Sequence, residues 1–183
     1  MAKNNLKEIL TEYENTLCDR TFKYVLSNNS EIRIVFYREN FCHLIGLQYL
    51  YKNDKHYLGR SGYESIKQDK INIEKMKLHS DKDYNYIKYR IRYIKQLPNL
   101  LRQGDVIKFY VDRCYPQSNI VADFIIVHKN KHYKLHLFLK QEKKGSTQYV
   151  PVSFIVKSDN DKNQNQYTER QEHKKVKDFT IIT

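Results

Sequence analysis

Two stretches near the C-terminal end of the sequence predict a β-hairpin. They run from Tyr133 to Lys140 and from Tyr149 to Val156, and a polar linker that contains Gly145 joins them. Apolar residues alternate with other residues in both stretches, and successive side chains of a strand point to opposite faces. If Lys140 pairs with Tyr149, one face collects all six apolar residues, whereas a shift by one residue would mix the faces. The six are Leu135, Leu137, Leu139, Val150, Val152 and Phe154.

The opposite face of this hairpin is predicted to be polar. The same register puts His136 opposite Ser153, close to Lys140 and Tyr149. An imidazole, a hydroxyl, an ammonium group and a phenol would then share one surface. We expect helices to cover the apolar face, which leaves this polar face open to a substrate.

Hydrophobic periodicity predicts an N-terminal helix, a second hairpin, two middle helices and further strands in the remaining chain. Apolar residues at helical spacing indicate an N-terminal helix from about Asn5 to Cys18. A second hairpin is expected over residues 21–38, with its turn at 28–30. Middle helices are expected at Glu64–Leu78 and Asp83–Leu101, and strands at 105–111 and 122–127.

These elements predict an α+β fold. N-terminal and middle helices would pack on one face of an antiparallel β-sheet with a C-terminal meander. Residues 1–156 would form the domain, and residues 157–183 a polar tail. Residues 157–175 are expected to be a long loop or a disordered linker without apolar anchors, because their composition is polar and nearly neutral. Phe179, Ile181 and Ile182 could add a short strand at the edge of the sheet.

The charge distribution favours a polyanionic partner. The chain has a formal net charge of +12, and residues 82–102 and 129–144 each carry six basic residues against one acidic residue. Such concentration fits a surface that follows nucleic-acid phosphates better than scattered lysines do. The predicted substrate-binding residues are Arg90, Arg92 and Lys95 of the middle helix, Arg33 and Tyr37 of the N-terminal hairpin, and Tyr149.

Several other classes of protein are not indicated. Cys18, Cys42 and Cys114 are far apart, which predicts reduced thiols in a cytoplasmic protein. No secretory signal, membrane span or nucleotide-binding glycine loop is evident. His128, His132 and His136 have the spacing of ligands on a helix, but this stretch is predicted to be strand–turn–strand, so neither a cofactor nor a metal is expected.

Two motifs resemble a nuclease family. The first is Phe41-x-His43-Leu44-x-Gly46, and the second is the paired stretch 135–140 and 149–154. Both are similar to motifs of the fourth phage group in the barnase–EndoU–colicin–RelE-like superfamily. That resemblance implies a small ribonuclease of a phage, mobile element or toxin system. His43, Lys140 and Ser153 are the residues with suitable chemistry that lie in the matched motifs.

The predicted function is therefore a metal-independent endoribonuclease that uses the 2′-hydroxyl of RNA as nucleophile. His43 or His136 would act as acid or base, while Lys140 and Ser153 would contact the phosphate. The expected partners are RNA, either tRNA or mRNA, and an antitoxin protein. Two alternatives remain open: a non-catalytic nucleic-acid-binding regulator, and an anti-defence inhibitor that binds a protein through its basic surface.

Overall fold

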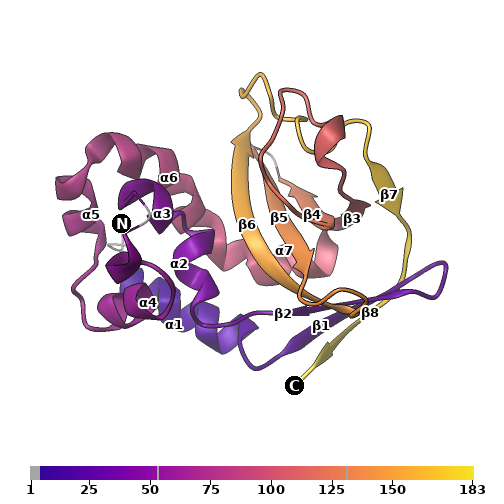
Figure 1. The fold of residues 1–183 in the computed structure, drawn as a ribbon, viewed down its shortest axis with the longest axis horizontal. Helices are drawn as coiled ribbons and strands as arrows, with labels where there is room; N and C mark the ends of the chain where they lie inside the picture. Colours follow the sequence, from indigo (N-terminus) through magenta and orange to yellow (C-terminus); the bar gives the residue numbers. More distant parts are fainter. Residues whose placement is uncertain (1–4, 53, 131) are drawn as a thin grey trace. The chain divides into compact units, whose positions relative to one another are not determined.

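The computed structural model describes residues 5–52, 54–130 and 132–183. The chain divides into two compact units. The helical unit contains the chain up to Asp19 and residues 37–97, and the sheet unit contains residues 20–36 and 98–183. Helices α1 to α6 belong to the first unit, and all the strands belong to the second (Figure 1). This combination confirms the predicted α+β class.

The helical unit begins with α1 (Leu6–Leu17), as the periodicity predicts. Asn5 caps this helix, because its side-chain oxygen accepts a hydrogen bond from the backbone N–H of Lys7 at 3.0 Å. The apolar residues that predict the helix are all buried, so they form its inner face. They are Leu6, Ile9, Leu10, Tyr13 and Leu17.

The remaining helices of this unit are shorter than the sequence predicts. The predicted helix Glu64–Leu78 is wrong, since α4 ends at Lys67 and α5 begins at Ile73. Asp69 has a positive φ of 56°, which ends the helical path, and Asn72 caps α5 with its side chain. The other elements are α2 (Asn40–Leu44), α3 (Leu47–Leu50), η1 (Lys55–Tyr57), α4 (Gly59–Lys67), α5 (Ile73–His79), α6 (Asp81–Tyr93) and η2 (Ile94–Gln96).

The sheet unit contains eight strands in the order β7-β3-β4-β5-β6-β2-β1-β8. Strands β3 to β6 pair with their neighbours in sequence, which confirms the predicted antiparallel meander. Only the pairing of β2 with β6 is parallel among the described pairings. The strands are β1 (Thr21–Leu26), β2 (Glu31–Val35), β3 (Asp105–Lys108), β4 (Phe124–Lys129), β5 (Tyr133–Gln141), β6 (Gln148–Ser158), β7 (Glu172–Lys174) and β8 (Val176–Ile182).

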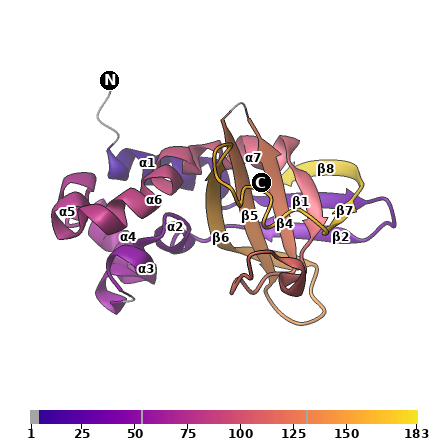
Figure 2. The same cartoon turned by 90° about the horizontal axis from the view of Figure 1, so that it is seen from above.

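The C-terminal segment joins the two edges of this sheet. Strands β7 and β8 lie at opposite edges, yet Lys175 alone separates them in sequence. The carbonyl of Lys175 accepts a hydrogen bond from the backbone N–H of Ser27 at 2.9 Å. Figure 2 shows the strands curving round from β8 to β7. Residues 172–174 and 176–182 of the predicted tail are therefore strands of the sheet.

Both faces of the meander are buried. On one face Phe138 packs with Phe109 and with Tyr167, whose ring centres lie 5.2 and 5.1 Å away. Tyr167 comes from the segment predicted to lack apolar anchors, and that prediction is wrong because this ring is buried. The side chain of Gln171 adds a second anchor through hydrogen bonds with both backbone groups of Tyr110, at 2.9 and 3.0 Å.

The α7 helix (Leu97–Gln103) supplies buried residues to the sheet unit. Leu100 and Leu101 are fully buried, and the carbonyl of Leu101 accepts a hydrogen bond from the hydroxyl of Tyr24 in β1. The sheet of this unit is thus covered by a helix of the same unit, α7, and also by Tyr167.

Candidate functional site

The α2 helix holds His43 at the surface of the helical unit. Its start is fixed by Asn40, whose side-chain oxygen accepts a hydrogen bond from the backbone N–H of Tyr37 at 2.8 Å. Cys42 and Leu44 on either side of His43 are fully buried, whereas His43 is exposed. The helix therefore buries its apolar residues and leaves the imidazole accessible to a ligand.

Gly46 lies in the turn between α2 and α3 and packs against α6. Its φ of +88° is in the left-handed region that glycine adopts without strain, and its N–H donates to the carbonyl of His43 at 3.0 Å. A Cβ atom at this position would lie 2.8 Å from Cγ2 of Ile87 and 3.4 Å from Cδ of Arg90. The absence of a side chain at Gly46 thus brings Arg90 beside a turn that begins three residues earlier with His43.

Two tyrosines hold the Arg90 guanidinium in place. Its Cζ atom lies 5.0 Å from the centre of the Tyr49 ring and 5.8 Å from that of Tyr86. The two rings contact each other edge to face, with their centres 5.3 Å apart. Guanidinium groups on aromatic faces are stabilised by the ring quadrupole, so this contact fixes the direction of the side chain.

Arg90 nevertheless retains an unused hydrogen-bond donor. The residue is only 5% exposed, and its buried Nη1 atom has no hydrogen-bond partner among the described residues. A buried charged donor without an acceptor is costly. The prediction of Arg90 as a surface contact is therefore corrected: it is a buried cation, and an anion reaching Nη1 would satisfy it.

The other predicted cations of this region are exposed. Arg92 lies near the end of α6 with its guanidinium 5.6 Å from the Tyr93 ring centre, and Lys95 lies in η2. Arg33 and Tyr37 are also exposed, but the Arg33 guanidinium donates to the Glu31 carboxylate at 2.8 and 3.0 Å. Of these residues Arg33 belongs to the sheet unit and the rest to the helical unit.

The predicted register of the C-terminal hairpin is wrong. Leu137 pairs with Phe154, and His136 pairs with Ile155 rather than with Ser153. A bulge between Phe138 and Leu139 then changes the register toward the turn. The cause is that both faces are buried, so the apolar pattern does not select one register.

His136 is closed to a substrate in this structure. Its side chain is 0% exposed, and its ring lies edge to face with Tyr167, centre to centre 5.5 Å. Burial is the main cause that lowers its pKa from 6.5 to about 3, and the charges of Lys134 and Lys157 add to this effect. The imidazole is thus neutral at ordinary pH, and the predicted open polar face does not exist.

The other predicted residues of the hairpin do not share a surface. Lys140 is exposed and pairs with Val150, whereas Ser153 is buried beside Phe138. Tyr149 packs edge to face on Phe124 at 5.3 Å, and burial raises the pKa of its phenol. His43 belongs to the helical unit and these residues to the sheet unit.

Sequence reasoning missed Tyr49 and Tyr86. Tyr86 precedes Arg90 by four residues on α6, a spacing at which helical side chains meet. That spacing alone could have identified the aromatic partner of Arg90. Tyr49 had no such signal, because it reaches Arg90 through the packing of α3 on α6.

Two structural features, a cluster of metal-ligating side chains and a membrane-spanning helix, are absent from the described part of the chain. No group of three or more histidine, cysteine or acidic residues there is arranged to hold a metal ion. No helix there combines the length and the apolar character needed to cross a membrane.

Comparison with known proteins identifies one family. The model of the phage-Barnase-EndoU-ColicinE5/D-RelE like nuclease4 family matches residues 5–181, nearly the whole chain. This match confirms the resemblance indicated by the two motifs. Neither the curated proteins nor the solved structures give a match.

Proposed function

Because the chain belongs to the phage-Barnase-EndoU-ColicinE5/D-RelE like nuclease4 family, we propose that it is a metal-independent endoribonuclease with its active site in the helical unit. The observation that carries this proposal is the turn from His43 to Gly46, which packs against Arg90. His43 is exposed at the start of this turn, and Arg90, which packs against Gly46 at its end, has a buried Nη1 donor without a partner among the described residues. These are an acid–base group and an anion-binding group.

The chemistry assigned to these residues is transesterification. His43 takes the proton from a 2′-hydroxyl, and the oxygen attacks the adjacent phosphorus. The bond between phosphorus and the 5′-oxygen breaks, and the leaving oxygen takes up a proton. The products are a 2′,3′-cyclic phosphate and a 5′-hydroxyl.

Arg90 has the role of stabilising the phosphate as negative charge accumulates. A donor that is already oriented needs no reorganisation during the reaction, which is why such groups contribute strongly to catalysis. Tyr49 and Tyr86 keep the guanidinium in place, and both rings are themselves partly exposed, at 46% and 63%. Exposed tyrosine rings suit stacking on unpaired bases, which favours single-stranded RNA as substrate.

His136 has no part in this reaction because it is buried. Lys140 is assigned a contact with the RNA backbone in the sheet unit, consistent with its exposed position. Tyr149 and Ser153 are assigned structural roles, since both are buried.

The decisive experiment is digestion of total RNA and purified tRNA in excess EDTA, followed by mapping of the cleaved ends. We expect internal cuts with 2′,3′-cyclic phosphate ends, while DNA of the same sequence remains intact. A His43→Ala protein purified in the same way controls for contaminating nucleases.

Two outcomes would overturn the proposal. Cleavage that stops in EDTA and returns with a divalent metal would exclude the metal-independent mechanism. Salt-dependent binding of RNA without any cleavage would favour the non-catalytic regulator.

A further inference from the structure

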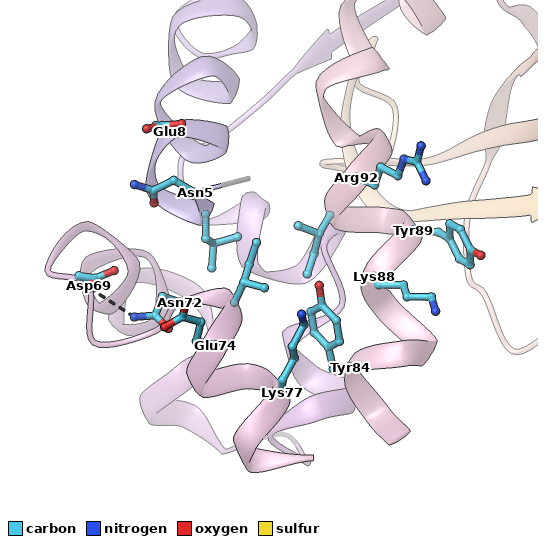
Figure 3. A pocket seen from close by; sticks show the side chains of 13 residues that line it. Asn5, Glu8, Asp69, Asn72, Glu74, Lys77, Tyr84, Lys88, Tyr89 and Arg92 are labelled. Atoms are coloured by element: carbon cyan, nitrogen blue, oxygen red, sulfur yellow. Dashed lines mark hydrogen bonds between the residues drawn. The ribbon is translucent and has the colours of Figure 1, made fainter. Parts of the chain in front are cut away.

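A pocket of about 830 Å³ opens between α1, α5 and α6 of the helical unit. Leu6, Ile73 and Ile91 line it with apolar side chains. The amide side chains of Asn5 and Asn72 lie at its edge (Figure 3). This size and this mixture of apolar and polar groups are typical of small-ligand sites. The proposed nuclease mechanism makes no use of it.

Lys77 and Tyr84 give the pocket a cationic and aromatic side. Figure 3 shows both side chains reaching into the space between the helices. The Nζ atom of Lys77 lies 5.3 Å from the centre of the Tyr84 ring. Lys88 of α6 also lines the pocket. An anionic group with a flat ring would find an ammonium and an aromatic face next to each other.

Asp69 and Glu74 line the other side of the pocket. The Asp69 carboxylate accepts a hydrogen bond from the side-chain amide of Asn72 at 3.3 Å. Carboxylates repel phosphate, but they accept hydrogen bonds from the N–H groups of a base edge. The two sides therefore give an incoming nucleotide a direction, with its phosphate at Lys77 and its base toward Asp69 and Asn72.

We propose that this pocket binds one nucleotide of single-stranded RNA, next to the phosphate held by Arg90. This proposal rests on the proposed function, since it takes RNA as the ligand. The base packs on the apolar side chains of the pocket and on Tyr84, and the phosphate contacts Lys77.

The pocket and the proposed active site share α6. Ile87 contacts the position of Gly46, and Ile91, four residues later, lines the pocket. Tyr84 and Arg90 are six residues apart, which is about 9 Å along a helix. One strand that crosses α6 can thus contact both sites with neighbouring nucleotides.

The test measures binding of a fluorescein-labelled 2′-O-methyl RNA hexamer by anisotropy. This probe has no free 2′-hydroxyl, so it cannot be cleaved and binding is read separately from catalysis. Lys77→Glu and Tyr84→Ala are compared with Lys82→Glu, which makes the same charge change as Lys77→Glu at an exposed position of α6 outside the pocket. We expect the two pocket variants to weaken binding about tenfold or more, and Lys82→Glu to weaken it much less.

Equal losses of RNA affinity in Lys77→Glu and Lys82→Glu would overturn the proposal that the pocket binds RNA, because they would indicate a general charge effect only. Circular dichroism checks the fold, and Tyr84→Phe, which retains the ring, should keep most of the affinity. His56→Ala, at an exposed position of the helical unit that does not line the pocket, should bind the hexamer as the wild type does. If pocket variants lose binding and no RNA is ever cleaved, the pocket stands and the nuclease proposal fails.

Discussion

The guanidinium of Arg90 lies 5.0 Å from the centre of the Tyr49 ring, and little of it reaches solvent. A lysine would keep the charge at this position but would lose the planar group that stacks on the ring. We predict that Arg90→Lys folds and cleaves RNA at least tenfold more slowly in kcat/KM. Arg60→Lys is the matched control, because Arg60 is exposed on α4 of the same unit and has no role in the proposed site. Equal activities of the two variants would show that Arg90 is structural.

His43→Ala should reduce cleavage by about a hundredfold or more, the usual contribution of an acid–base group. The fold should remain, since the His43 side chain is exposed and its carbonyl still accepts the hydrogen bond from Gly46. His56→Ala is the control, since His56 is another exposed histidine of the helical unit. A fully active His43→Ala protein would remove this residue from the mechanism.

The sequence predicts elements well where one face of an element is buried. The stripe of α1 follows from apolar spacing alone, because solvent on the opposite face of the helix makes that spacing visible. The predicted register of the hairpin is wrong because both faces of the meander are buried. Tyr167 covers the face that carries His136 and Phe138, so the alternation no longer distinguishes inside from outside.

The candidate site shows a similar division. His43 could be found from its motif. The burial of Arg90 could be found only by asking which residues share one face of the helix. Arg90 lies three residues after Ile87 and four before Ile94, both fully buried, so it shares their face. A basic residue on the apolar face of a helix indicates a specific binding role more strongly than a basic residue on a charged surface does.

Gly46→Ala should destabilise the protein by about 1–3 kcal/mol, the usual effect of overpacking a core. The added methyl group would lie 2.8 Å from Cγ2 of Ile87, and the φ of +88° would add strain. Gly59→Ala isolates the strain, because Gly59 also has a positive φ but a Cβ there meets nothing within 4 Å. Urea unfolding of both variants measures the difference. Equal losses of unfolding free energy in the two variants would mean that α6 does not pack tightly against position 46.

The double variant Arg92→Glu with Lys95→Glu should weaken RNA binding and flatten its dependence on salt. Removing one phosphate contact reduces the slope of log K against log salt by about 0.7 for single strands. Arg90 is left unchanged, because a buried glutamate there would disturb the fold. An unchanged slope, measured by titration at several salt concentrations, would exclude the C-terminal end of α6 from the RNA surface.

The buried imidazole of His136 should make the stability of the protein depend on pH. Its pKa is about 3 in the folded chain, against an ordinary value of 6.5. Between these values the unfolded chain binds a proton that the folded chain excludes, so the stabilising contribution is complete above about pH 6.5 and falls as the pH drops toward 3. One such proton corresponds to about 1.4 kcal/mol per pH unit.

Replacing His136 with leucine should flatten this dependence, because leucine takes up no proton in either state. The measurement is the free energy of unfolding in urea at pH 4, 5, 6 and 7. His173→Leu is the control, since His173 is exposed on β7. Carboxylates add their own pH dependence to all three proteins, so the comparison uses differences between the curves. If His136→Leu and the wild type lose stability in parallel, the imidazole is not excluded from protonation in the folded chain, and Tyr167 does not seal that face of the sheet.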